Sequence, residues 1–310
     1  MAETVHRSAP RLRSFSTKQV LNHRNLPEGT NRSALLLALG AIALWGTLAP
    51  LGVSLQHVPP FLLTGVGLLV GSLIGLPLSG WKLSAWKVPL PTLALGVYGL
   101  FGFHFLLFIA LRHAPPVQAN LVNYLWPLGI VLMAPIFLPG LKLRPLHVVA
   151  ALVGFAGAAL AILGGRNVQA GFAWGYIPAM CSAFVWASYS LLSRRVPPFA
   201  NAAIGLFGLV SGLLSLLCHA LLESPVELGV NDWGLLVALG LGPLGGAFYL
   251  WDAALKRGDP RQIGILSFLT PLLSTLALLW VRAEMPSASI VAAAVMIVGA
   301  AVMGSRAQTN

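Results

Sequence analysis

The amino-acid sequence predicts an all-α polytopic membrane protein, with ten transmembrane helices arranged as two inverted five-helix repeats and both termini cytoplasmic. Three observations predict this fold: successive hydrophobic segments long enough to cross a bilayer, a one-sided distribution of Lys and Arg, and a motif that recurs later in the chain. Each observation is independent of the other two, and together they specify the number of helices, their orientation and their symmetry.

The composition is typical of an integral membrane protein. Of 310 residues, 57% are hydrophobic and 9% are charged, whereas a soluble domain carries about 25% charged residues. The net charge of +11 comes from basic residues between hydrophobic runs, with no basic patch interleaved with aromatic residues, so we exclude nucleic acid as a partner. Cys181 and Cys218 fall inside apolar runs, and the sequence offers no metal-ligand spacing and no sign of a cofactor.

Hydrophobic segments follow one another from residue 33 almost to the end of the chain. A bilayer core about 30 Å thick needs roughly 20 helical residues, and lipid leaves the backbone no partner outside the helix. The predicted spans are 33–55, 60–79, 89–112, 116–138, 145–164, 172–194, 200–221, 232–256, 260–281 and 286–304. Residues 1–32 are polar and basic, and we interpret them as a disordered cytoplasmic tail, with an amphipathic surface segment as the alternative.

The distribution of basic residues predicts the orientation. With the N-terminus in the cytoplasm, Arg112, Arg166 and Arg282 are the only basic residues on the outer side, out of 19 in the chain. Cytoplasmic loops of membrane proteins carry an excess of Lys and Arg, so this orientation is favoured. An error of one helix in the count would place the later loops on the wrong side and remove the asymmetry.

A repeated motif divides the chain into two similar halves. Residues 110–118 recur in residues 254–262, and Leu125-Trp126-Pro127 recurs as Leu269-Thr270-Pro271 at the same offset. The predicted repeats are residues 33–164 and 172–304. Because each repeat contains five spans, the second is inverted relative to the first. This architecture is typical of alternating-access transporters, which bind their substrate near the midplane between the repeats.

The recurring motif, together with Trp45-Gly46 in the first span, resembles the EamA branch of the drug/metabolite transporter superfamily over about residues 33–304. Within that branch, the spacing and the aromatic content look closest to bacterial aromatic amino acid exporters. The resemblance implies a central cavity walled by helices of both repeats, with the last helix of each repeat as lateral support. It also implies multi-pass localisation in the bacterial inner membrane and the export of amino acids, other metabolites or drugs.

Polar residues placed deep in a membrane helix are costly and therefore indicate function. In the fourth span, Asn120, Asn123, Tyr124 and the helix-breaking Pro127 share one helical face. The ninth span places Ser267, Thr270 and the helix-breaking Pro271 in matching positions. We expect these faces to form a cavity wall, and interhelical hydrogen bonding is the alternative.

His104 lies deep in the third span, where it is a candidate for binding substrate or for carrying a proton. A histidine hydrogen-bonded to its neighbours is the alternative interpretation. Aromatic residues accompany it in the third span and in the equivalent region of the eighth: these candidates are Tyr98, Phe101, Phe248, Tyr249 and Trp251.

Trp45 in the first span and Ser182, Trp186 and Tyr189 on one face of the sixth complete the candidate substrate site. Aromatic faces in a cavity stack on aromatic substrates or attract cations, although core packing explains such residues equally well. Asp252 is a candidate coupling carboxylate, but its position four residues before Lys256 favours an ion pair.

We therefore expect a transporter that exports aromatic or apolar amino acids by alternating access, driven by the substrate gradient. The alternative within this class is an exporter of cationic drugs or other metabolites, whose cavity we would expect to contain an unpaired carboxylate. An intramembrane enzyme is a less favoured alternative, because the spans contain no paired aspartates and no Ser-Lys dyad. A channel is also less favoured, because it would need rings of like side chains supplied by an oligomer. The expected partners are a small-molecule substrate and the lipid bilayer; the sequence leaves the oligomeric state open.

Overall fold

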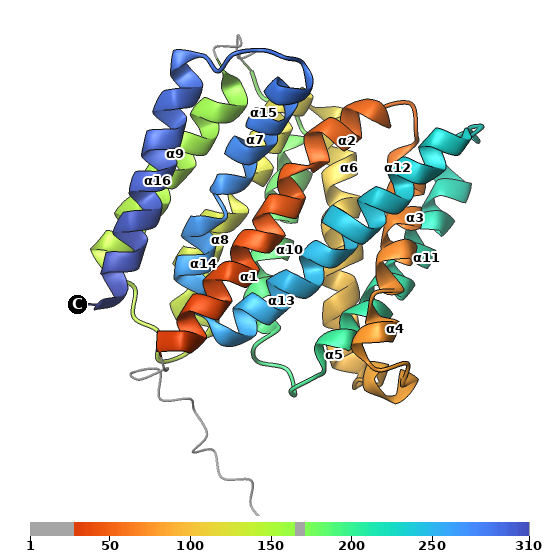
Figure 1. Ribbon diagram of the computed structural model, residues 1–310, viewed down its shortest axis with the longest axis horizontal. Helices are drawn as coiled ribbons and strands as arrows, with labels where there is room; N and C mark the ends of the chain where they lie inside the picture. The colour runs from red at the N-terminus through yellow and green to blue at the C-terminus, as the bar shows by residue number, and fades with distance from the viewer. Residues whose placement is uncertain (1–27, 165–170, 310) are drawn as a thin grey trace, which may run out of the picture.

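The computed structural model describes residues 28–164 and 171–309, and within these ranges every regular element is a helix (Figure 1). Nine helical segments in this part of the chain are long and apolar enough to cross a membrane. The tenth is the apolar helix Tyr176–Leu192, which has 17 residues. The predicted fold class is confirmed, whereas the side of the membrane that holds the termini stays a prediction. Residues 1–27 of the tail that we predict to be disordered lie outside the described part of the chain.

The first five spans are built from short helices that stack end to end. In chain order these are α1 (Glu28–Gly46), α2 (Leu48–Ser54), α3 (Pro60–Ser72), α4 (Gly75–Leu78), η2 (Leu83–Trp86), α5 (Leu90–Val97), η3 (Tyr98–Gly102), α6 (Phe103–His113), α7 (Pro116–Asn123), α8 (Trp126–Phe137) and α9 (Pro145–Leu163). The first of them begins at Glu28, five residues before the predicted span.

In the second five spans, the eighth and ninth are divided, and the sixth, seventh and tenth are each crossed by one continuous helix. The elements of these spans are α10 (Tyr176–Leu192), η4 (Asn201–Ala203), α11 (Ile204–Leu222), α12 (Val230–Leu241), η5 (Gly242–Gly246), α13 (Ala247–Arg257), α14 (Pro260–Leu266), α15 (Leu269–Val281) and α16 (Ala288–Thr309). α10 begins later than the span predicted from residue 172. Just before it, Gly175 packs so closely on the end of α6 that an added Cβ would lie 2.6 Å from the carbonyl oxygen of Ala110.

The two repeats interrupt their helices at matching positions. The π-helical turns η3 and η5 occupy equivalent places in the third and eighth spans. The fourth and ninth spans both break just before a proline, at Pro127 and Pro271. Proline has no N–H group, so Pro127 leaves the carbonyl of Asn123 without its usual helical partner. Interruptions of this kind are tolerated in membranes only where the backbone faces protein or a cavity.

Small residues allow the helices to approach closely. A Cβ added to Gly71 in α3 would lie 2.6 Å from the Cα of Gly245 in η5, and one added to Gly157 in α9 would lie 2.8 Å from Ile297 in α16. α9 and α16 are the last helices of the two repeats, and they run side by side at the left edge of the bundle in Figure 1. The remaining helices surround the centre of the molecule.

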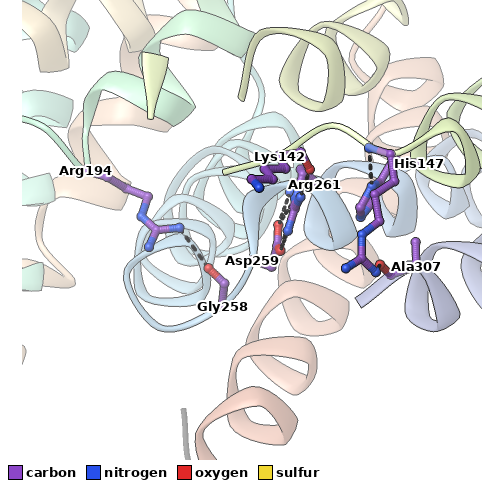
Figure 2. A network of polar contacts seen from close by, with 8 residues as sticks. Lys142, His147, Arg194, Gly258, Asp259, Arg261 and Ala307 are labelled. Atoms are coloured by element: carbon purple, nitrogen blue, oxygen red, sulfur yellow. Dashed lines mark hydrogen bonds and ion pairs between the residues drawn. The ribbon is translucent and has the colours of Figure 1, made fainter. Parts of the chain in front are cut away.

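One end of the bundle, which we call the basic end, is held by arginine contacts to backbone carbonyls (Figure 2). Arg261 at the start of α14 donates to the carbonyl of Lys142, which belongs to the other repeat, and also pairs with Asp259. Arg194 donates to the carbonyl of Gly258 at 2.9 Å, and Arg144 donates to that of Ala307 at 2.8 Å. The contacts of Arg261 and Arg144 join the two repeats at this end, whereas the contact of Arg194 lies within the second repeat.

The opposite end is organised around a buried carboxylate. The side chain of Glu223, which follows α11, is only 2% exposed. It accepts hydrogen bonds from the N–H groups of Phe61 and Leu62 at the start of α3, and it contacts Arg112 of α6 at 2.9 Å and His219 at 3.0 Å. One carboxylate therefore connects the second, third and seventh spans.

We predict that Glu223→Gln destabilises the protein by roughly 2–3 kcal/mol, because it removes the charge that pairs with Arg112 and caps α3. Thermal unfolding in detergent measures the effect. Glu227→Gln, an exposed carboxylate in the same connection, is the matched control and should unfold like the wild type. Equal unfolding temperatures for the two variants would contradict this role of Glu223.

We predict a pH-dependent contribution from Asp259 at the basic end. Burial alone would raise its pKa, but the hydrogen bonds and the charge of Arg261 hold the pKa of Asp259 below its usual value. The pair therefore stabilises the fold above about pH 4, and this stabilisation is lost as pH falls through the lowered pKa. Asp259→Asn should destabilise the protein by about 1.5–3 kcal/mol at pH 7. Unfolding curves of variant and wild type should converge in acid, and a gap independent of pH would contradict the interpretation.

Candidate functional site

A cavity of about 220 Å³ lies between the two repeats, near the middle of the spans. Its walls come from both repeats, and among its lining residues none carries a fixed charge. They are Trp45, Leu48, Leu63, Thr64, Phe103, His104, Leu107, Phe108, Asn120, Asn123, Tyr124, Trp126, Trp186, Pro243, Leu244, Phe248 and Thr270. The residues fall into a polar group and an aromatic group.

The polar group comes mainly from the interrupted helices. Asn123 at the end of α7 accepts a hydrogen bond through Oδ1 from the hydroxyl of Ser182, at 2.8 Å. His104 lies in the first turn of α6, two residues after the π-helical turn η3, and its Nδ1 lies 2.6 Å from the carbonyl oxygen of Leu100 in that turn. A carbonyl only accepts, so Nδ1 carries the proton and Nε2 of the neutral ring has a free lone pair.

The aromatic group closes the cavity toward the basic end. Trp45 lies at its centre, with its ring centroid 6.1 Å from Trp126 and 5.8 Å from Trp186. One turn further toward the basic end than Phe248, Trp251 packs 5.1 Å from Trp45 and donates its indole N–H to Ser190. These four tryptophans, which we call the tryptophan floor, separate the cavity from the basic end.

Eight of the residues predicted from sequence line the cavity: Trp45, His104, Asn120, Asn123, Tyr124, Trp186, Phe248 and Thr270. The other candidates lie outside its lining. Ser182 supports Asn123, and Trp251 belongs to the tryptophan floor. The remainder make the following contacts: Tyr98 with the Ser188 hydroxyl, Phe101 with the Phe105 ring, Tyr189 with the Trp186 ring, Tyr249 with the carbonyls of Gly71 and Ser72, and Ser267 with the carbonyl of Gly264.

Asp252 is buried beside Lys256, with 2.6 Å between the carboxylate and ammonium groups, so the ion pair expected from their spacing is present. Asp252 does not line the cavity. Of the two helix-breaking prolines, Pro271 lines a second cavity, described below, and Pro127 is buried at the start of α8.

Sequence reasoning missed several lining residues, including Thr64, Phe108 and Trp126. Thr64 is a polar residue within a span, so the signal used for Asn120 would have found it. Phe108 lies one helical turn beyond His104, and Trp126 lies three residues beyond Asn123, so both share a face with a predicted residue. The apolar lining residues, by contrast, carry no signal that separates them from lipid-facing ones.

A second cavity, of about 620 Å³, continues from the first toward the end opposite the basic end. The two cavities share Asn120 and Tyr124. The second is lined mainly by α7, the end of α9, and α15, and its charged residues are Arg282 and Glu284. The central cavity therefore adjoins open space on one side and the tryptophan floor on the other.

The chain is similar to known transporters along most of its length. It is 44% identical over 280 residues to "Aromatic amino acid exporter YddG" of Ancylobacter novellus, covering 88% of this chain and 97% of that protein. A protein of the same name from Escherichia coli K12 is 26% identical over 271 residues, covering 79% and 87%. "Uncharacterized inner membrane transporter YhbE" of the same bacterium is 27% identical, covering 77% and 78%.

A solved crystal structure superposes with a TM-score of 0.82 at 43% identity, covering 89% of this chain and 96% of the other. The sequence also matches the EamA-like transporter family twice, over residues 32–163 and 173–305. Five helical spans lie in each matched segment, and the interrupted helices of the two segments correspond. This multi-pass membrane protein therefore belongs to the EamA-like transporter family.

Proposed function

We propose that the protein exports aromatic and large apolar amino acids across the bacterial inner membrane. The observation that carries the proposal is the uncharged cavity between the repeats, which is aromatic on one side and polar on the other. The names of its relatives, one of them 44% identical, support the same substrate class.

The chemistry of the lining residues fits a zwitterion with an aromatic side chain. Ring faces and edges of Trp45, Trp186 and Phe248 offer the geometries in which aromatic groups pack favourably. Asn120, Tyr124 and Thr270 offer hydrogen bonds to a carboxylate and an ammonium group without adding net charge. A zwitterion has no net charge, so it enters such a cavity at a lower desolvation cost than an ion.

The same chemistry disfavours a permanently cationic substrate. A desolvated cation needs a partner of opposite charge. Asp252, the acidic residue of the eighth span, does not line the cavity and is paired with Lys256 below the tryptophan floor. Cation–π contacts with the tryptophans remain available, but they lack an anion to complete the site.

In alternating access, the closed end of the bundle would open while the opposite end closes. The basic end is closed by Arg194, Arg261 and the tryptophan floor, while the central cavity adjoins the second cavity near the opposite end. If the basic end is cytoplasmic, as the charge distribution predicts, this conformation faces outward. We propose that the repeats 33–164 and 172–304 rock against each other, and that the arginine contacts break when the cavity opens inward.

We propose facilitated diffusion down the substrate gradient as the energetics. A proton relay would need a second titratable group near His104, and the cavity lining contributes no carboxylate. Asp252 is held by Lys256 and is separated from the cavity by the tryptophan floor.

We predict that liposomes containing the purified protein take up phenylalanine and tryptophan saturably without an imposed ion gradient, and that lysine neither enters nor competes. Asn120→Leu keeps the size of the side chain and removes hydrogen bonds, so KM for phenylalanine should rise about 5–10-fold. Asn231→Leu, an exposed position outside both cavities, is the matched control and should leave KM unchanged.

Uptake no greater than into empty liposomes, with and without a pH gradient, would contradict the amino acid assignment. Uptake of a lipophilic cation in place of phenylalanine would support the export of cationic drugs. Uptake that requires a pH gradient would contradict facilitated diffusion alone.

A further inference from the structure

We propose that Thr270, with the amide group of Asn123, forms a subsite that binds the carboxylate of the transported amino acid, while His104 faces its ammonium group. This assignment rests on the proposed function and adds the direction in which the substrate lies. It follows from which donors and acceptors of the cavity wall are already occupied.

Thr270 has a buried hydroxyl group that is unused within the protein. The residue is 4% exposed and lines the cavity, and its Oγ1 has no hydrogen-bond partner among the described residues. A buried hydroxyl without a partner costs about 1–3 kcal/mol. Thr270 lines the cavity, so a rotation of its side chain can turn the hydroxyl toward a ligand that supplies the missing partner.

The neighbouring hydroxyls of the same span are occupied by the helix itself. Ser267 donates to the carbonyl of Gly264 at 2.6 Å, and Thr275 donates to that of Pro271 at 2.8 Å. Serine and threonine in helices commonly make this backward bond. The hydroxyl of Thr270 could make the same backward hydrogen bond but does not, so its proton remains available to a ligand in the cavity.

The position of Thr270 favours an anion. It is the second residue of α15, a helix of 13 residues that begins at the interruption in the ninth span. The N-terminal end of a helix carries a partial positive charge, which attracts carboxylates and repels ammonium groups. The unpartnered hydroxyl and the helix terminus therefore point to the same kind of ligand group.

Asn123 adds further uncharged hydrogen-bond donors to the carboxylate subsite. Its Oδ1 lies 2.8 Å from the hydroxyl of Ser182, which shares its single proton between Asn123 and the carbonyl of Ala179 at 2.7 Å. The two N–H groups of the amide are then the unused part of the Asn123 side chain. Both Asn123 and Thr270 line the cavity. Together they offer three N–H or O–H donors and no charge, a set that suits a carboxylate.

His104 provides a hydrogen-bond acceptor for the ammonium group at the other end of the substrate. Its Nδ1 is bonded to the carbonyl of Leu100, so its Nε2 accepts a hydrogen bond and has no proton to offer. An ammonium group has three donors and no acceptor, which makes it the matching partner. The inferred orientation places the substrate carboxylate near the start of α15 and its ammonium group near α6.

Transport competition tests the carboxylate subsite. For the wild type and Thr270→Val, we would measure KM for phenylalanine and the inhibition constant of phenylalanine methyl ester, which lacks the negative charge. Thr270→Val should raise KM about tenfold and leave the ester's inhibition constant within twofold, so the preference for the acid over the ester falls. Thr270→Ser keeps the hydroxyl and should preserve that preference.

Thr92→Val is the matched control, because Thr92 is 1% exposed and its hydroxyl is equally unpartnered, but it lies outside the cavity. It should leave both constants unchanged. If Thr270→Val does not fold, Thr270→Ala gives the same comparison. An unaltered preference in a folded Thr270 variant, with normal phenylalanine uptake, would overturn the subsite alone. Absence of phenylalanine uptake by the wild type would instead overturn the proposed function, and the subsite with it.

Discussion

The structure depends on one constraint: in the hydrocarbon core of a bilayer, a backbone or side-chain polar group has no water to bind. Uninterrupted helices meet this constraint, and α9 and α16, which lie at the edge of the bundle, have no interruption. The interruptions fall in helices that border the central cavity, at η3, at η5 and before Pro127 and Pro271. These helix interruptions therefore lie in the spans that surround the central cavity.

Inverted symmetry supplies two similar walls, and the side chains make them chemically different. His104 and Phe248 occupy equivalent positions and both line the cavity, as do Trp126 and Thr270. In each pair one residue has a side chain suited to hydrogen bonding, and the other contributes a large aromatic ring. A symmetric cavity would bind a substrate equally well in two orientations, whereas this distribution of donors, acceptors and rings favours one. Symmetry thus provides the moving parts of a carrier, and its local loss provides recognition.

The sequence was sufficient to predict the helices and the repeat architecture, and eight of the fifteen candidate substrate-binding residues line the central cavity. Span lengths, basic residues and the recurring Leu-x-Pro motif follow from the bilayer, and polar residues such as Asn123 and Thr270 are visible because they are costly in lipid. Tyr98, Tyr189 and Tyr249 were predicted by the same rule, but they make contacts outside the cavity lining. A period of 3.6 residues identifies the inward face of a helix, but it does not reveal whether that face lines the cavity or packs against protein. The role of Glu223 was invisible for another reason: its partners are backbone N–H groups of a helix about 160 positions away.

The two ends of the bundle are closed by different kinds of interaction, which bears on how the carrier moves. At the basic end, arginines bind carbonyl oxygens that belong to connections between helices, and such contacts can break while each helix stays intact. At the opposite end, Glu223 caps α3 and holds Arg112, so its loss would disturb the helices themselves. The second and third spans of the first repeat are therefore joined to the seventh span of the second repeat near that end. Rocking that opens the basic end would turn the repeats about this junction and would displace Trp45 and Trp126 from Trp186 and Trp251. In the proposed transport cycle, the tryptophan floor would serve both as the surface on which an aromatic substrate rests and as the barrier that separates it from the basic end.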